Sequence, residues 1–261
     1  MFRWLSIAIF AACTPPAGPG GGGSSTVDAA HDAPSRTSNV VVSLTFDDTL
    51  DDQYQVGAML ASRGMHATFF INSPRVGLAS YMTLAQVREL RDAGNEIAGH
   101  TLDHVYLTQL DAATARHEIC DDRNALVGMG FDVTSFAYPF GDDNATVEQI
   151  VRDCGYSAGR SIGGLYTADS CTTCPYTNQM PPVDVLNVRT APSVAGAVTA
   201  DSLEAYIIDA EAHGGGWLPF VFHHVCNACN PAAVGPAVLE KFLDRLQARG
   251  ARVVTVAELL R

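Results

Sequence analysis

One pattern recurs along the chain from Asn39 onward and limits the folds that it can adopt. An amphipathic stretch ends at a glycine, and a short run of β-forming residues follows within a few positions. A glycine just beyond a helix tolerates the left-handed backbone that ends many helices. Clear examples are Gly64 before 67–70, Gly94 before 96–98, Gly130 before 133–136 and Gly250 before 252–256. Alternating helices and strands predict parallel strands in a single α/β domain, and about seven repeats favour a barrel over an open sheet.

Polar side chains suited to metal binding follow two of the predicted strands. The first strand, residues 40–46, leads into Asp47 and Asp48, and the third ends just before His100, with His104 four residues on. By alternation Asp47 faces the barrel interior and Asp48 lies at the rim. One carboxylate and two imidazoles hold a divalent ion and leave positions open for water and substrate. An acidic loop and two surface histidines are the plain alternatives. The shared C-terminal edge of the strands, where barrel enzymes carry their chemistry, favours a metal site.

The first 38 residues predict an export signal and a tether. Residues 1–13 combine the basic Arg3, a short apolar run and a final Cys13 after two alanines, as in a bacterial lipoprotein signal whose cysteine is lipidated. An ordinary signal peptide with a chance cysteine is the alternative. Residues 14–38 are rich in Gly, Pro and Ser and predict a flexible linker. We therefore expect a protein held at the bacterial cell surface or in the periplasm as a lipoprotein, or secreted.

The six cysteines of the remaining chain predict disulfides, because their number is even and the protein is expected to be exported. They are Cys120, Cys154, Cys171, Cys174, Cys226 and Cys229. The alternative is a zinc site built from the two Cys-x-x-Cys pairs, whose spacing suits four-cysteine coordination. If those four cysteines associate, Cys120 and Cys154 are left as a pair.

The charge of the chain excludes two classes of partner. The formal net charge is −12, so the protein repels nucleic acid and anionic membranes. Contact with a membrane is expected only through the lipid on Cys13. With 47% hydrophobic residues, the chain has enough apolar side chains for one full core.

Four segments resemble motifs of the polysaccharide deacetylase (NodB-homology) family of carbohydrate esterases. They are Thr45-Phe46-Asp47-Asp48, His100-Thr101-Leu102-Asp103-His104, Phe136-Ala137-Tyr138-Pro139-Phe140-Gly141 and Phe220-Val221-Phe222-His223. They fall in the family's order and span roughly residues 40 to 256. The resemblance implies a distorted (β/α)7 barrel, with residues 39–261 as one polysaccharide deacetylase catalytic domain.

The resemblance also assigns roles to the first two motifs. Asp47 is the catalytic base, and Asp48, His100 and His104 are the ligands of a divalent metal ion. Two imidazoles and one carboxylate suit zinc first, and cobalt or nickel as well.

The later motifs supply the remaining groups. The resemblance gives the oxyanion to the backbone N–H of Phe140, with Tyr138 as a further substrate contact. The acid that protonates the leaving amine lies at the end of a late strand, at His223 or His224. Bulky residues at 218, 220 and 222 should face the helices, which turns His223 inward. His224 is then a core or rim histidine.

One position departs from the family pattern. Where the third motif commonly has an arginine that orients the catalytic aspartate, this chain has Ala137. Arg189 is our first candidate to replace that arginine, and Arg160 is the second. The plain alternative for Arg189 is a surface salt bridge. Trp217 could stack on a sugar, but its place at the start of a strand favours the core.

These features together predict a metal-dependent hydrolase that removes N-acetyl groups from a glycan such as chitin, peptidoglycan or poly-N-acetylglucosamine. The partner is an acetylated polysaccharide or oligosaccharide, and a monomer is expected. An O-acetyl xylan esterase or a hydrolase of non-sugar amides would use the same residues. Outside enzymes, the alternative is a non-catalytic glycan-binding surface lipoprotein. Loss of Asp47 or of a metal ligand would favour that last reading, and all four residues are present.

Overall fold

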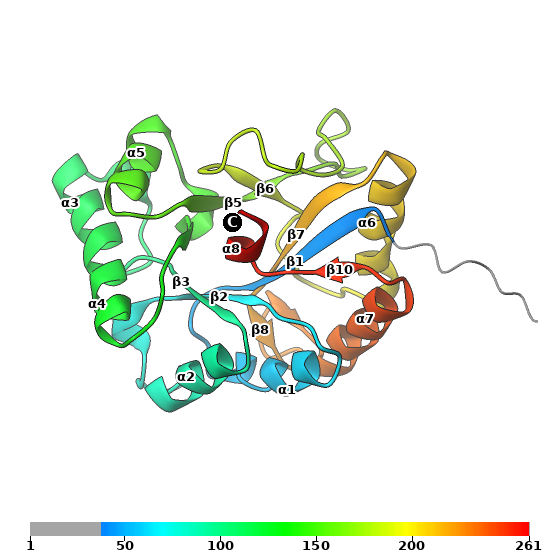
Figure 1. Ribbon diagram of the computed structural model, residues 1–261, viewed down its shortest axis with the longest axis horizontal. Helices are drawn as coiled ribbons and strands as arrows, with labels where there is room; N and C mark the ends of the chain where they lie inside the picture. The colour runs from blue at the N-terminus through cyan, green and yellow to red at the C-terminus, as the bar shows by residue number, and fades with distance from the viewer. Residues whose placement is uncertain (1–37, 261) are drawn as a thin grey trace, which may run out of the picture. The chain divides into compact units, whose positions relative to one another are not determined.

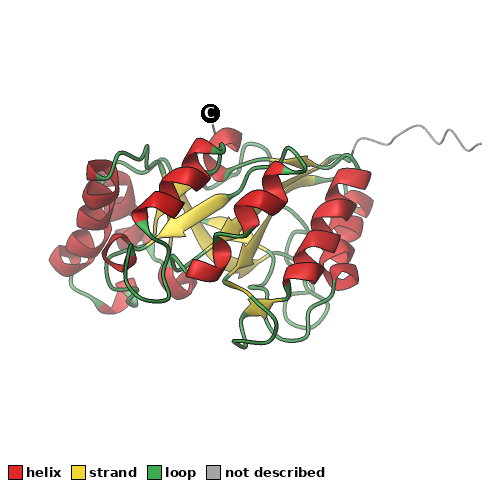
Figure 2. Cartoon of the chain, turned by 90° about the horizontal axis from the view of Figure 1, so that it is seen from below, coloured by secondary structure: helices red, strands yellow, loops and turns green. Residues whose placement is uncertain are grey.

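The computed structural model describes residues 38–260, where eight strands form one sheet and pair in parallel. Figure 2 shows these strands lying inside a layer of helices. The predicted signal, the lipidation site at Cys13 and the linker up to residue 37 lie outside the described residues and stay predictions. None of the described helices is long and apolar enough to cross a membrane.

Strands and helices alternate along the chain, as the recurring glycine pattern predicts (Figure 1). The sheet strands are β1 (Val40–Phe46), β2 (Thr68–Ile71), β3 (Glu96–Gly99), β4 (Ser135–Ala137), β5 (Ala158–Gly164), β6 (Val188–Thr190), β7 (Gly216–Phe222) and β10 (Arg252–Val253). The α-helices are α1 (Val56–Ala61), α2 (Leu84–Asp92), α3 (Ala112–Arg116), α4 (Asp122–Gly128), α5 (Ala145–Asp153), α6 (Ala200–Ala212), α7 (Pro236–Ala248) and α8 (Val256–Leu259). A small separate sheet joins β8 (His224–Val225) and β9 (Ala233–Val234).

The sheet curls until its two sides nearly meet. Its order runs β10-β1-β2-β3-β4-β5-β6, and β7 pairs with β1 along seven residues. The remaining gap lies between β6 and β7. There the backbone N–H groups of Ala191 and Val194 donate to the carbonyl oxygens of Pro219 and Val221 at 3.0 and 2.9 Å. The predicted distorted (β/α)7 barrel is confirmed.

The two faces of β1 bury different sets of residues. Val40, Val42, Leu44 and Phe46 belong to the large core between strands and helices. A smaller cluster fills the barrel interior and contains Val41, Phe70, Ala98, Ala137, Ala158, Val188, Trp217, Val254 and Val256. Trp217 is fully buried and donates its indole N–H to Ser43 at 2.9 Å, so it is a core residue, as expected.

Helix ends follow local sequence signals. Thr83 forms a capping box with Gln86 at the start of α2, and Gly94 follows that helix at φ 92°. Asp111 caps α3 with its side chain, and Thr108 donates to the side chain of Asp142.

The connection between β5 and β6 has no helix. Residues 165–187 form a loop that carries a disulfide between Cys171 and Cys174. Two further disulfides join Cys120 to Cys154 and Cys226 to Cys229. The disulfide prediction is confirmed, and no four-cysteine zinc site forms among the described residues.

The N-terminal end of the barrel is closed by α8. Figure 1 shows this helix over the middle of the sheet. The backbone N–H of Val256 donates to Thr68 of β2 at 3.0 Å, and that of Ala257 donates to Glu96 of β3 at 2.9 Å. The C-terminal end of the strands is therefore the end left for chemistry.

Candidate active site

Asp48, His100 and His104 come together at the C-terminal ends of β1 and β3. Oδ1 of Asp48 lies 3.2 Å from Nε2 of His104 and 3.8 Å from Nε2 of His100. One potential ligand atom of each residue lies within 4.8 Å of the other two. The structure therefore gathers the three side chains that the sequence nominates as metal ligands.

The turns that carry these side chains have unusual backbone geometry. Asp48, Thr101 and His104 have φ values of 80°, 65° and 56°, a region that non-glycine residues rarely occupy. Asn72 holds the second turn, because its side-chain amide donates to the carbonyl oxygens of His100 and Thr101 at 2.5 and 3.0 Å. Strained residues of this kind gather at functional sites, where surrounding contacts fix them.

The imidazole of His100 is oriented to ligate through Nε2. Its Nδ1 lies 2.8 Å from the carbonyl oxygen of Ala137, so Nδ1–H donates and Nε2 carries the free electron pair. Nε2 is buried and has no hydrogen-bond partner among the described residues. Burial lowers the pKa of His100 to about 4, and burial also lowers the pKa of His104. Both rings are thus neutral at neutral pH, as metal ligands must be.

Asp48 is the anionic member of this group. Burial raises its pKa, but the electrostatic fields of His100, His104, His223 and Arg75 together bring it below the usual value. Nη1 of Arg75 lies 3.1 Å from Oδ1 of Asp48, a contact that the sequence did not indicate. An ionised carboxylate, two neutral imidazoles and a buried nitrogen without a partner fit a divalent ion.

Asp47 is buried beside this group, and its two carboxylate oxygens differ. Oδ2 accepts a hydrogen bond from Nη2 of Arg160 at 2.6 Å, and both side chains are fully buried. Oδ1 is also buried and, within residues 38–260, has no hydrogen-bond partner. One oxygen is therefore fixed while the other is free to accept a proton, which is what a general base requires.

The arginine that contacts Asp47 is Arg160 of β5, not our first candidate, Arg189. The guanidinium of Arg160 lies 4.9 Å from the ring centroid of Phe70, a residue of the barrel interior. Arg189 of β6 is exposed and lines a surface cavity together with Asn178. The expectation for Arg189 is wrong because its side chain leaves the barrel on the outer side.

Tyr138 and Phe140 of the third motif have different surroundings. Tyr138 is fully buried and its hydroxyl donates to the carbonyl oxygen of Leu186 at 2.8 Å, so the expected substrate contact of Tyr138 is wrong. Phe140 is 48% exposed and has φ 61°. Its ring stacks on Tyr106 with centroids 4.0 Å apart and meets His104 edge-on at 4.5 Å. Phe140 therefore stands at the rim, against a candidate metal ligand.

The two adjacent histidines after β7 have separate partners. Nε2 of His223 lies 3.9 Å from Oδ2 of Asp47, and its Nδ1 lies 3.3 Å from Oγ of Ser193. Nδ1 of His224 lies 2.7 Å from Oδ2 of Asp52. Of the pair, His223 is thus the one beside Asp47, as strand alternation predicts.

Asp122, at the start of α4, stabilises the turn that carries His100. Its two carboxylate oxygens accept the backbone N–H groups of Ser73 at 2.7 Å and His100 at 3.0 Å. Sequence reasoning missed Asp122, since it lies on a helix and no local pattern marks the contact. Asn72 was missed too, although it directly follows β2, and the strand-end rule applied to Asp47 would have found it.

Asp122 should make the protein less stable as the pH rises from about 4 to about 7. Burial raises its pKa from 3.8 to about 7, so over this range the carboxyl is protonated when folded and ionised when unfolded. Its contribution to the free energy of unfolding is complete below the pKa that Asp122 has in the unfolded chain. It is lost as the pH rises through the pKa that Asp122 has in the folded protein, a difference of about 4 kcal/mol. Urea unfolding with a chelator should show wild type losing stability relative to Asp122→Asn as the pH rises. Parallel pH profiles would contradict this assignment.

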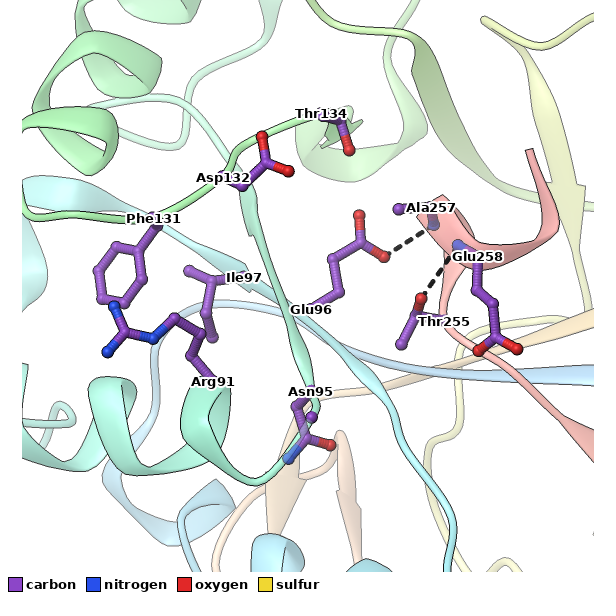
Figure 3. A pocket seen from close by; sticks show the side chains of 11 residues that line it. Arg91, Asn95, Glu96, Ile97, Phe131, Asp132, Thr134, Thr255, Ala257 and Glu258 are labelled. Carbon is purple, nitrogen blue, oxygen red and sulfur yellow. Dashed lines mark hydrogen bonds between the residues drawn. The ribbon is translucent and has the colours of Figure 1, made fainter. Parts of the chain in front are cut away.

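A cavity of about 280 Å³ lies at the opposite end of the barrel (Figure 3). Glu96 and Thr255 line it, and both bond to backbone N–H groups of α8. None of the candidate metal ligands borders it, nor does Asp47. In barrels of this type the N-terminal end serves stability, so this cavity is not a candidate active site.

Fold and site together define a (β/α)7 barrel with a candidate metal site at its C-terminal rim. Residues 35–159 match the family model described as polysaccharide deacetylase. The match confirms, over these residues, the resemblance read from the motifs.

The similarity to known proteins covers different shares of the chain. The chain is 30% identical to YxkH of Bacillus subtilis over 126 residues, which are 48% of this chain and 45% of that protein. It therefore matches less than half the length of that relative. It is 26% identical to the peptidoglycan-N-acetylglucosamine deacetylase of Bacillus cereus over 223 residues, 85% of this chain and 88% of that protein.

A solved structure shares the fold. It is a family 4 acetyl xylan esterase from Clostridium thermocellum in complex with a cobalt ion, with a TM-score of 0.58 and 21% identity. The match covers 84% of this chain and 89% of that one. At this identity the likeness concerns the barrel alone.

Proposed function

We propose that this protein is an exported, metal-dependent hydrolase that removes N-acetyl groups from a glycan. The observation that carries the proposal is the state of Asp47, with one oxygen on Arg160 and the other free. It lies directly beside the residues that would hold a metal ion. Similarity to a peptidoglycan-N-acetylglucosamine deacetylase supports a polymer of N-acetylated sugars as substrate. Three disulfides support a location outside the cytoplasm.

Asp48, His100 and His104 would hold the ion. When bound, a divalent ion supplies a Lewis acid that polarises the acetyl carbonyl and lowers the pKa of a water. Zinc, cobalt and nickel all suit this donor set, and a relative of the same fold was solved with cobalt. The tautomer of His100, set by its bond to Ala137, keeps Nε2 available for this purpose.

The proton movements fall to Asp47 and His223. Oδ1 of Asp47 accepts the proton of the attacking water while Arg160 keeps the carboxylate in place. Nε2 of His223, 3.9 Å from Oδ2 of Asp47, donates a proton to the leaving amine nitrogen. Ser193 lies against the other nitrogen of that ring and orients it. The backbone N–H of Phe140 donates to the oxyanion.

The stacked rings of Tyr106 and Phe140 support a sugar substrate. Both are close to half exposed, at 46% and 48%, and Phe140 contacts His104. Paired aromatic rings at a rim give a flat apolar wall, on which the C–H face of a pyranose can pack. The acetyl group of that sugar would then reach Asp47, His223 and the proposed metal site.

Acetate release tests the proposal directly. Chelator-treated protein, with and without added zinc or cobalt, is incubated with chitooligosaccharides, peptidoglycan and acetylxylan. We expect metal-dependent acetate release from the N-acetylated glycans, lost again on adding chelator. No release from any substrate by metal-loaded protein would overturn the proposal. Release mainly from acetylxylan would replace N-deacetylation with ester hydrolysis.

A further inference from the structure

A second group of metal-ligating side chains lies on the rim, immediately after His223. It combines Asp52, His224, Cys226 and Cys229, each of which offers one ligand atom within 4.8 Å of the others. Oδ2 of Asp52 lies 2.7 Å from Nδ1 of His224, and Oδ1 accepts the backbone N–H of Val225 at 3.1 Å. Segments 172 positions apart in the sequence thus meet at one point.

This setting distinguishes Cys226 and Cys229 from the other Cys-x-x-Cys pair. In the part of the chain that the structure describes, no group of three or more such side chains includes Cys171 or Cys174. Cys229 is exposed and Cys226 is half-buried, so solvent reaches the disulfide between them. Two disulfides of equal spacing therefore differ in whether an imidazole and a carboxylate stand beside them.

We propose that Asp52, His224, Cys226 and Cys229 form a redox-controlled binding site for a thiophilic divalent cation of the zinc and cadmium class. In the oxidised protein the two sulfurs form a disulfide and do not ligate. A dithiol reductant transfers two electrons and two protons to this S–S bond, giving two cysteine thiols and becoming a disulfide itself. The thiols lose their protons on binding the cation.

The reduced group has the donors that such an ion prefers. Two thiolates, one imidazole and one carboxylate complete a tetrahedral shell, and a Cys-x-x-Cys spacing is typical of structural zinc sites. The ion would replace the proton that Asp52 and His224 share in their hydrogen bond. Asp48, His100 and His104 offer nitrogen and oxygen only, so the thiolates distinguish the two sites chemically.

Cobalt titration tests the proposal, since thiolate-to-cobalt charge transfer absorbs in the near ultraviolet and the nitrogen and oxygen site lacks this band. The full chain is treated with a chelator, reduced with a phosphine, freed of chelator and titrated with cobalt. We expect the band in reduced wild type and in Cys171→Ser/Cys174→Ser. We expect its loss in oxidised wild type and in Cys226→Ser/Cys229→Ser. A band that survives in this last variant, or is missing from reduced wild type, would overturn the proposal.

A second measurement uses the unaltered protein and so does not depend on the folding of variants. Reduced wild type is alkylated with iodoacetamide with and without zinc, and each cysteine is followed by peptide mass spectrometry. Zinc should slow modification of Cys226 and Cys229 and leave Cys171 and Cys174 unaffected. Equal rates at all four would speak against the site. Neither measurement involves acetate release, so the result is independent of the proposed function.

Discussion

Replacing Asp47 with asparagine should lower acetate release from an N-acetylated glycan by between about 10² and 10⁴-fold. Asparagine keeps the shape of the side chain but cannot take a proton from water. Because the proposed ligands are Asp48, His100 and His104, the variant should still bind one equivalent of metal at this site. Steady-state rates of acetate release, compared at equal metal content, measure the effect. Undiminished turnover in metal-loaded Asp47→Asn would remove Asp47 as the base.

Asp51→Asn provides a matched control for that substitution. Asp51 is an exposed carboxylate in the same loop and takes no part in the candidate site. Its replacement should leave the rate unchanged. Asp47→Asn also leaves the buried guanidinium of Arg160 without its anion, so the variant must be assayed at a temperature where circular dichroism shows it folded.

Much of the barrel could be predicted because the sequence signals that specify its strands and helices are local. Alternation along β1 separates the residues that face the helices from those inside, and a glycine marks the end of each helix that leads into a strand. The same alternation would also have placed Tyr138 beside Phe136 in the outer core, as found. The family resemblance implies a substrate contact for Tyr138 instead, whereas its side chain is buried and bonded to Leu186. The helix missing between β5 and β6 had no local signal.

The sequence predicts those residues of the candidate site that directly follow strands. It does not predict contacts between segments that lie far apart in the chain. Asp48 and His100 were found because strand ends converge at one rim of a barrel. Arg160 and Asp47 lie 113 positions apart, and their contact depends on the register between β1 and β5 through the strands that separate them. No spacing rule relates residues so far apart in the sequence. The sequence alone therefore does not decide whether Arg160 or Arg189 contacts Asp47.

Replacing Arg160 with methionine should lower the free energy of unfolding by about 3–5 kcal/mol, because it leaves the charge of Asp47 buried without a partner. Both side chains of the pair are fully buried, so water cannot take the place of the arginine. Urea unfolding near neutral pH in the presence of chelator measures the loss. The double variant Asp47→Asn/Arg160→Met removes both charges and should recover most of it.

Arg189→Met is the control that shows which of the two arginines is paired with Asp47. Its side chain is exposed on β6, so its replacement should change the free energy of unfolding by no more than about 0.5 kcal/mol. A larger loss in Arg189→Met than in Arg160→Met would contradict the pairing seen in the barrel. So would a double variant as unstable as Arg160→Met alone, since the cost would then come from lost packing. If the charge of Asp47 is the cause, the cost must disappear with that charge.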